Sequence, residues 1–223
     1  MDLIKIKNQI KREELDKITK ALLAEQVVVL PTDTVYGLHC LATSKKAVNK
    51  IYKIKERPKS IPLLVLVKSY CMLHDYFKIN KKQEDYIRSI WPRTTREAHN
   101  FSKFSRSSTS ENSEVKLLEN SHPVSFILED KGKLHIHLNK ENQGVAVRLP
   151  QNILLINILK KVNIPIVSTS LNISGKKTLQ NLKNIEKYFK VEPDLVVDAG
   201  ILKGKSSKLV DIRDIKNVKT VRE

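Results

Sequence analysis

The feature that most constrains the fold is the stretch of residues 27–38, where an apolar run changes abruptly to small polar residues. Residues 27–30 are four consecutive apolar residues, three of them β-branched, which predicts a buried strand. Pro31 lacks a backbone donor, so strand pairing should stop there. The Thr-Asp-Thr triplet of residues 32–34 then fits a ligand site at the carboxyl end of an α/β sheet. A turn that merely starts the next element is the alternative that this pattern leaves open.

Apolar and amphipathic segments alternate along the rest of the 223 residues, which predicts a single domain over residues 1–223. Its fold class is α/β, with a twisted, mixed, open sheet and flanking helices. The predicted helices cover residues 12–25, 44–56, 70–77, 81–90, 152–162 and 181–189. The further strands are predicted at 62–67, 124–130, 133–138, 144–150, 164–167, 194–197 and in 204–211.

Residues 93–122 differ from their surroundings in composition. They are rich in serine, threonine and mixed charge, have few apolar residues and show no sustained period. This composition is typical of a mobile loop and not of a second domain. We therefore predict a flexible insertion between two elements of the sheet domain.

The net charge of +17 and the pI of about 9.8 raise the question of a nucleic-acid partner. Most of the basic residues are lysines, aromatic residues make up only 5%, and no basic run is interleaved with stacking side chains. Scattered lysines keep a protein in solution without forming a binding groove. The composition therefore favours a solvated basic surface, and weak attraction to RNA stays open as the alternative.

Several function classes are disfavoured by what the sequence lacks. No apolar run approaches the roughly 20 residues that a membrane span needs, and the N-terminus does not resemble a signal peptide. Cys40 and Cys71 form no CxxC pair, which predicts buried, reduced thiols of a cytoplasmic protein. The six histidines show no metal-ligand spacing.

Three further motifs have both a structural and a functional interpretation. Lys55 and Arg57 lie at the end of a predicted helix, where they could compensate the helix dipole or form a cationic phosphate clamp. Arg148 lies at the end of a predicted strand, a position that is usually only on the surface. Residues 168–175 contain several hydroxyls and an amide after a strand, which fits either a turn with a helix cap or a polar cradle for phosphate.

Taken together, the order and spacing of these motifs resemble the YrdC-like family of threonylcarbamoyl-AMP synthases. The resemblance covers nearly the whole chain and rests on the segments 31–38, 55–58, 145–150 and 168–175. It implies a YrdC/RibB-like fold. The segment 93–122 interrupts a Trp-Pro-Gly-Pro run of the family, of which Trp91, Pro92 and Pro123 stand in this sequence.

The resemblance also implies a reaction. L-threonine and bicarbonate would give a carbamate that attacks the α-phosphate of ATP, releasing pyrophosphate and forming threonylcarbamoyl-AMP. Such an enzyme is a nucleotidyltransferase, uses Mg²⁺ with ATP, and supplies downstream threonylcarbamoyl-transferase proteins that modify adenosine 37 of tRNA. The reaction needs positioning and neutralised phosphate charge more than covalent catalysis. The motifs contain no evident nucleophile–base pair, which agrees with that requirement.

Carried over residue by residue, the family pattern predicts two sets of contacts. The predicted catalytic residues, which also bind ATP, are Lys55, Arg57, Ser170 and Asn172, with Thr178 and Arg222 as further ATP-binding residues. The predicted threonine-binding residues are Thr32, Thr34, Arg148, Ser168 and Ser207. The sequence departs from the family at Leu66, Gly144 and Lys208, where histidine, threonine and a hydroxyl residue are usual.

Two other classes of function remain open at this point. An RNA-binding module without turnover would account for the charge. Another enzyme on the same scaffold, such as a sugar-phosphate lyase or a carbamoyl-transfer enzyme, is the second alternative. The lyase would need a cluster of acidic metal ligands, for which Asp33 alone is a poor start.

Overall fold

The structure, a computed structural model, describes residues 1–6, 10–91, 123–135, 138, 144–183, 185–202, 204 and 206–223. Its strands are β1 (Asp2–Lys5), β2 (Val28–Leu30), β3 (Gly37–Leu41), β4 (Leu64–Leu66), β5 (Phe77–Lys78), β6 (Val124–Asp130), β7 (Val145–Arg148), β8 (Ile166–Ser170), β9 (Leu195–Asp198), β10 (Lys208–Asp211) and β11 (Lys219–Arg222). Its helices are α1 (Arg12–Leu23), α2 (Lys45–Ile54), α3 (Tyr70–Tyr76), α4 (Lys81–Ile90), α7 (Ile153–Val162) and α8 (Ile185–Tyr188).

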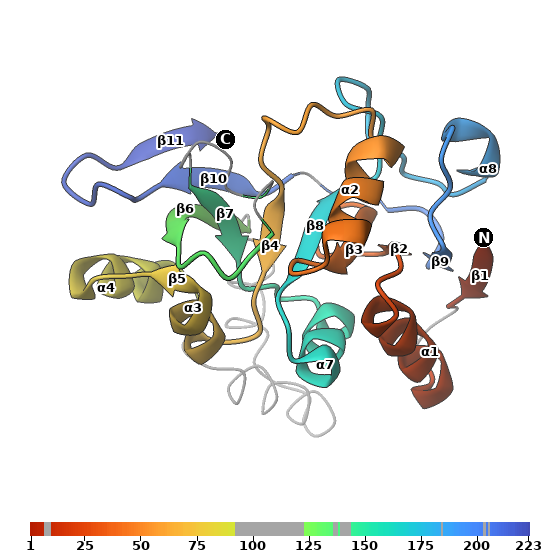
Figure 1. Cartoon of the computed structure of the whole chain (residues 1–223), viewed down its shortest axis with the longest axis horizontal. Coiled ribbons are helices and arrows are strands. Elements are labelled where there is room, and N and C mark those ends of the chain that lie inside the picture. The colour runs from red at the N-terminus through yellow and green to blue at the C-terminus, as the bar shows by residue number, and fades with distance from the viewer. Residues whose placement is uncertain are drawn as a thin grey trace, which may run out of the picture.

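The strands form one sheet in the order β1-β9-β2-β3-β8-β4-β7-β6-β10-β11, and β5 pairs with β6. The pairing is mixed: β2 is parallel to β9, β3 is antiparallel to β8, and β4 is parallel to β7. The two chain ends lie at opposite ends of the sheet, next to β1 and β11 (Figure 1). The predicted α/β class with a mixed sheet and flanking helices is confirmed.

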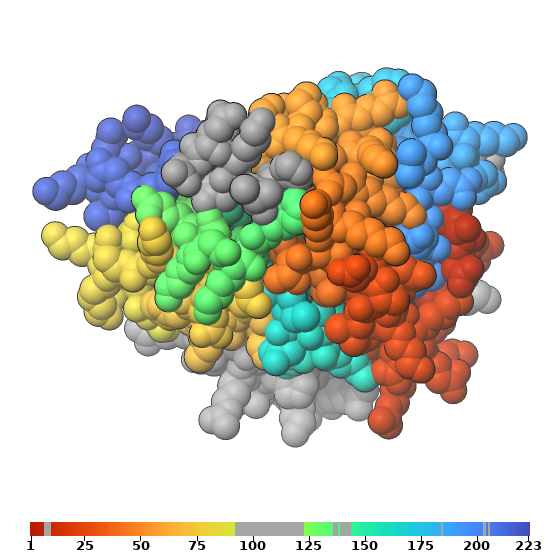
Figure 2. All heavy atoms as spheres, viewed as in Figure 1, coloured from red at the N-terminus to blue at the C-terminus, as the bar shows by residue number. Residues whose placement is uncertain are grey.

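The central strands are buried on both faces and divide the core in two. In β2, Val29 joins a core cluster with apolar residues of α2, α3 and α4, whereas Val28 and Leu30 join a second cluster with α1 and α7. Because successive side chains of a strand point to opposite faces, the two clusters mark the two faces of the sheet. We call the side of α1 and α7 the second face. The space-filling view shows α1 (red) and the β10–β11 hairpin (blue) at opposite ends of the molecule (Figure 2).

Local signals fix the ends of α2, which positions two of the predicted site residues. Ser44, the first residue of the predicted helix 44–56, caps its N-terminus by accepting a hydrogen bond from the backbone N–H of Ala47. At its C-terminus the chain turns through Glu56, whose φ of 48° is in the left-handed region. Lys55 and Arg57 therefore lie on either side of a sharp bend and point in different directions.

Several predicted elements need correction. Residues 133–135 and 138 are not in a strand, so the prediction of a strand at 133–138 is wrong for the described part. The predicted helix at 181–189 is reduced to the single turn of α8. Strands β1, β3, β5 and β11 were not predicted. Cys71 is exposed and only Cys40 is buried, so half of the thiol prediction is wrong.

The predicted insertion at 93–122 lies outside the described residues, but the chain on either side of it is described. The indole N–H of Trp91, at the end of α4, donates to the carbonyl of Val124 at 2.9 Å, at the start of β6. The described residues on the two sides of the segment therefore lie next to each other. In the described part of the chain, no helix has the length and apolar character needed to cross a membrane.

Candidate functional site

A cavity of about 200 Å³ lies on the second face of the sheet, between the strands and the loops that follow them. From the strands, its lining includes Gly37, Leu64, Ala146, Arg148, Ser168 and Ser170, which share this face by their alternation. Thr169 of β8 also contributes to the lining. From the loops and the hairpin, the lining includes Thr32, Thr34, Val35, Tyr36, Arg57, Pro62, Leu63, Ser206, Ser207, Leu209 and Arg222. The cavity thus opens where α1 and α7 leave the face uncovered.

Arg148 supplies a buried positive charge to this cavity. Its side chain is only 4% exposed, and its Nη2 lies 3.1 Å from Oδ1 of Asp33. This is a charge contact without hydrogen-bond geometry, because Asp33 Oδ1 has no hydrogen-bond partner in the described structure. Arg148 Nε likewise has none. Burial lowers the pKa of Arg148 although Asp33 raises it. Because its Nε is buried without a described partner, the guanidinium retains a donor for a ligand.

Two further arginines line the same cavity. Arg57 donates from Nε and Nη2 to the carbonyls of Ile61 and Pro62, which fixes its direction after the bend. Arg222 donates from Nε and Nη2 to the carbonyl of Ser207. Burial lowers the pKa of both guanidiniums, and the charge of Arg222 lowers the pKa of Arg57 and of Arg148 further. No described lining residue is acidic, so the lining has an excess of positive charge, which suits an anionic ligand.

The hydroxyl groups of the site are held by hydrogen bonds. Thr32 Oγ1 donates to the carbonyl of Val35 at 2.7 Å and accepts from the N–H of Thr34 and of Val35, so it closes the turn after β2. Its hydroxyl also lies 2.8 Å from the hydroxyl of Thr34. Ser207 Oγ lies 2.9 Å from the buried Ser125 Oγ. These hydrogen bonds set the directions of the hydroxyls along the cavity wall.

Tyr36, at the end of the turn after β2, forms hydrogen bonds to the loop that follows β9. Its hydroxyl donates to the carbonyl of Gly200 at 2.7 Å and accepts from the N–H of Ala199. Burial raises its pKa to about 12, so the phenol stays protonated. It joins the loop after β2 to the loop after β9.

The structure places two of the predicted phosphate-binding residues behind the cavity wall. Lys55 is 1% exposed, and its Nζ donates to the carbonyls of Ser170 and Asn172 and to Oδ1 of Asn172, at 2.6 to 3.0 Å. The Asn172 Oδ1 atom also accepts from Ser170 Oγ at 2.7 Å. Burial and the charge of Arg57 lower the pKa of Lys55 to about 7. In this arrangement Lys55 and Asn172 hold Ser170, which does line the cavity.

Thr178 lies apart from these residues. It lines a neighbouring open hollow of about 810 Å³ together with Lys177, Leu179 and Tyr188. The hollow shares Val35 and Ser206 with the cavity, so the two adjoin.

The residues at the three positions where the sequence departs from the family contact other parts of the protein. Leu66 is fully buried in the second-face core. Gly144 has φ of 78°, and a Cβ there would come within 2.7 Å of Ile127 Cγ2. Lys208 forms an ion pair with Glu223 at 3.1 Å.

Sequence reasoning missed the apolar and glycine part of the lining. Gly37, Leu64 and Ala146 carry no chemical signal, and only their common strand face places them together. It also missed Asp33 as the partner of Arg148, and Ser206. The signal for Asp33 was its place between two threonines that were themselves predicted to be in the site.

Comparison with known proteins identifies the family of this chain. The family model Sua5/YciO/YrdC, described as "Telomere recombination", matches residues 20–97 and 95–223. A threonylcarbamoyl-AMP synthase of Yersinia enterocolitica is 26% identical over 215 residues, which cover 95% of this chain and 96% of that protein.

Two solved structures share the fold. The P. abyssi Sua5 structure complexed with L-threonine has a TM-score of 0.74 and 22% identity and covers 95% of this chain, which spans only 54% of that protein. E. coli YciO has a TM-score of 0.71 and 21% identity, covering 100% of this chain and 94% of that protein. The match of the family model over nearly the whole sequence is decisive, and the chain belongs to the Sua5/YciO/YrdC family.

Proposed function

We propose that this protein is an L-threonylcarbamoyladenylate synthase, a nucleotidyltransferase that makes threonylcarbamoyl-AMP and pyrophosphate from L-threonine, bicarbonate and ATP. The observation that carries the proposal is the convergence of Arg57, Arg148 and Arg222 on one small cavity lined by hydroxyls and by no described carboxylate. An amino-acid carboxylate together with a triphosphate matches this excess of positive charge. The name of the Yersinia relative and the L-threonine in the Sua5 title support the same reaction.

Arg148 is placed to receive the carboxylate of threonine. It is the most buried of the three guanidiniums and retains an unpaired Nε donor. A planar guanidinium can bind a carboxylate through two parallel hydrogen bonds, which also orients the amino acid. Thr32, Thr34, Ser168 and Ser207 surround it with hydroxyls that could contact the amine and the side-chain hydroxyl.

Arg57, Arg222 and Ser170 would then contact the phosphates. The amine of threonine and bicarbonate give a carbamate and water, and a carbamate oxygen attacks the α-phosphorus while the bond to pyrophosphate breaks. Both the attacking oxygen and the leaving group are negative, so cations on either side lower the barrier. The nucleoside would extend from this cavity into the adjoining hollow that contains Thr178.

Lys55 and Asn172 would act through Ser170, whose position they fix by the contacts given above. A Mg²⁺ ion would enter with ATP, bound mainly by phosphate oxygens and reached from the protein by hydroxyls. The donor set fits this mode, because the described residues contain no group of three His, Cys, Asp or Glu side chains that could hold a metal by themselves. The same finding disfavours the sugar-phosphate lyase.

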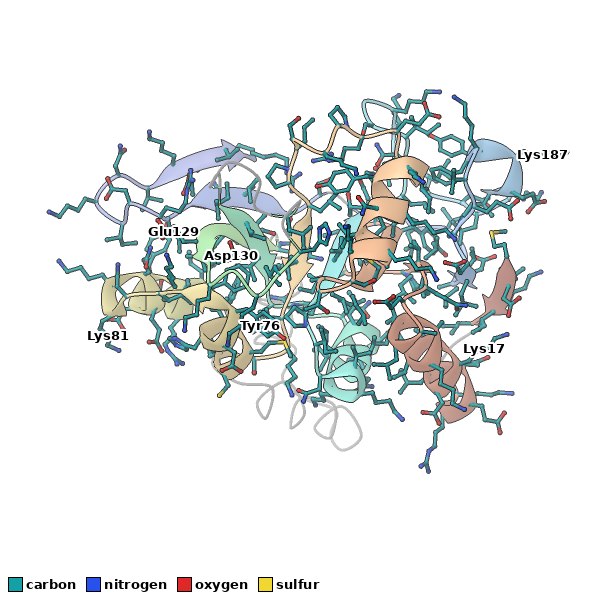
Figure 3. All side chains as sticks on the ribbon, viewed as in Figure 1. Lys17, Tyr76, Lys81, Glu129, Asp130 and Lys187 are labelled. Carbon is teal, nitrogen blue, oxygen red and sulfur yellow. The ribbon has the colours of Figure 1, made fainter. Side chains whose placement is uncertain are left out.

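The product would be passed to threonylcarbamoyl-transferase proteins that modify tRNA. Direct RNA binding has less support in the structure. The labelled lysines Lys17, Lys81 and Lys187 come from three different helices and point outward at separate places on the molecule (Figure 3). Such a dispersed charge would attract RNA weakly and with a strong dependence on salt.

The test is to incubate the protein with ATP, Mg²⁺, L-threonine and bicarbonate, and to measure pyrophosphate and the adenylate by mass spectrometry. We expect pyrophosphate only when both threonine and bicarbonate are present. Equal release without an amino acid, or with serine in place of threonine, would refute the assignment. The control is an Arg57→Ala variant, which should remain folded and lose activity.

A further inference from the structure

His39 is a buried histidine that the proposed reaction does not use. It lies in β3, directly opposite Ser168 of β8 in the antiparallel pairing. Its Nε2 is 3.1 Å from Ser168 Oγ. His39 is fully buried, whereas Ser168 lines the cavity beside Arg148. The imidazole lies on the same face of the sheet as the cavity, next to it, and contacts the lining through the hydroxyl of Ser168.

Gly37 provides the space for this contact. Gly37 and His39 are two residues apart in β3 and share one face of the sheet. A Cβ on Gly37 would come within 2.8 Å of His39 Cε1 and 3.3 Å of Nε2. The imidazole therefore lies along the strand over Gly37. A side chain at position 37 would crowd the imidazole against the carbonyl of Thr169, which a Cβ would approach to 3.1 Å, and would disturb the contact with Ser168.

The imidazole is neutral in this position. Burial, reinforced by the charge of Arg148, lowers the pKa of His39 to about 3. A neutral imidazole does not repel the adjacent guanidinium, and it offers one donor and one acceptor nitrogen. One hydrogen bond to Ser168 removes the free rotation of that hydroxyl and leaves its remaining hydrogen-bonding capacity for the cavity.

We propose that His39 is a positioning residue that orients the Ser168 hydroxyl for the amino-acid substrate held by Arg148. The inference rests on the proposed function, since it assigns the amino acid to this end of the cavity. Its carrying observation is the His39–Ser168 hydrogen bond in the space left by Gly37. His39 itself touches no substrate, so its removal should change the use of threonine and leave that of ATP unchanged.

The test measures L-threonine binding by calorimetry and the two KM values by pyrophosphate release. A single neutral hydrogen bond corresponds to an effect of roughly two- to tenfold. We therefore expect His39→Ala to weaken threonine binding and raise the KM for threonine by that factor, with the KM for ATP unchanged. His39→Gln, which keeps a polar group of similar length, should recover part of the loss. His74→Ala, on the exposed surface of α3, is the matched control.

The Ser168→Ala background separates positioning from a general effect on packing. The double variant Ser168→Ala/His39→Ala should have the same KM for threonine as Ser168→Ala alone. Gly37→Ala should reproduce the His39→Ala phenotype in a protein whose histidine is intact, which keeps the test open should His39→Ala not fold. The proposal would be overturned if His39→Ala weakened threonine binding equally in the presence and in the absence of Ser168. It would also be overturned if threonine binding were unchanged in both His39→Ala and Gly37→Ala.

The wild-type protein distinguishes this failure from failure of the proposed function. If the wild type and the variants bind threonine and release pyrophosphate equally well, only the role of His39 is refuted. Wild-type protein that neither binds threonine nor responds to it refutes the function and the positioning role together.

Discussion

Replacing Arg148 with lysine tests the site most directly, because it keeps the charge and removes the planar fork. Arg148 Nη2 contacts Asp33 at 3.1 Å, and Nε has no partner. A lysine has one compact ammonium group in place of a guanidinium that can face Asp33 and a ligand carboxylate at once. Arg148→Lys should therefore retain the fold and weaken the binding of threonine.

The magnitude follows from the bonds lost. A hydrogen bond to a charged group contributes about 1.5–3 kcal/mol. Loss of one of the two bonds of a bidentate pair thus corresponds to a rise in the KM for threonine of about 10- to 150-fold. The KM for ATP should change by less than about twofold, because the positive charge near the phosphates is preserved.

The assay is pyrophosphate release with threonine and ATP varied separately. Arg88→Lys on α4 is the matched control, because Arg88 is paired with Glu84 on the outer surface and lines neither hollow. A higher KM for ATP with unchanged threonine saturation would show that Arg148 binds phosphate. Unchanged values for both substrates would remove Arg148 from the site.

Four other outcomes are expected. Arg57→Ala should lower kcat by about 10²–10³-fold with an unchanged melting temperature, since one transition-state cation is lost; near-normal turnover would make Arg57 a structural residue. Lys55→Met should lower the free energy of unfolding in urea by about 2 kcal/mol, because buried acceptors lose their donor, whereas the exposed Lys53→Met should not. Between pH 6.5 and 5 the wild type should lose about 2 kcal/mol more stability than His39→Gln, because unfolded histidine binds a proton that His39, with its lowered pKa, does not; equal losses in acid would refute this. Replacement of residues 93–122 by one glycine should preserve folding and activity, because Trp91 and Val124 already meet; an unfolded deletion protein would show that the segment is part of the core.

The fold was predictable where local pattern and burial agree. The apolar run before Pro31 is a strand as expected, and the predicted helices 44–56 and 152–162 appear as α2 and α7, each capped at its N-terminus by a side chain, Ser44 or Asn152. Strand β3 was not predicted, because Gly37 and His39 interrupt its apolar pattern. It is a strand because it lies between β2 and β8, which satisfy its backbone from both sides.

The directions in which the site side chains point could not be predicted from the sequence. Lys55 and Arg57 have the same charge and are two residues apart. Because of the bend at Glu56, Lys55 lies behind the cavity wall whereas Arg57 lines the cavity. The oxygens that hold Lys55 belong to residues more than one hundred positions later in the chain. Spacing can predict that such residues belong to one site, but only the packing decides which of them faces the ligand.

The three arginines explain why each motif was ambiguous on its own and informative in combination. Arg57, Arg148 and Arg222 each follow or end an ordinary element, where a basic residue is common. Brought together by the order of the strands, they repel one another and are partly desolvated, and the described structure offsets this with the single carboxylate of Asp33. An arrangement that costs stability in the empty protein is favourable once an anion is bound. Their grouping is therefore better explained by a ligand than by folding.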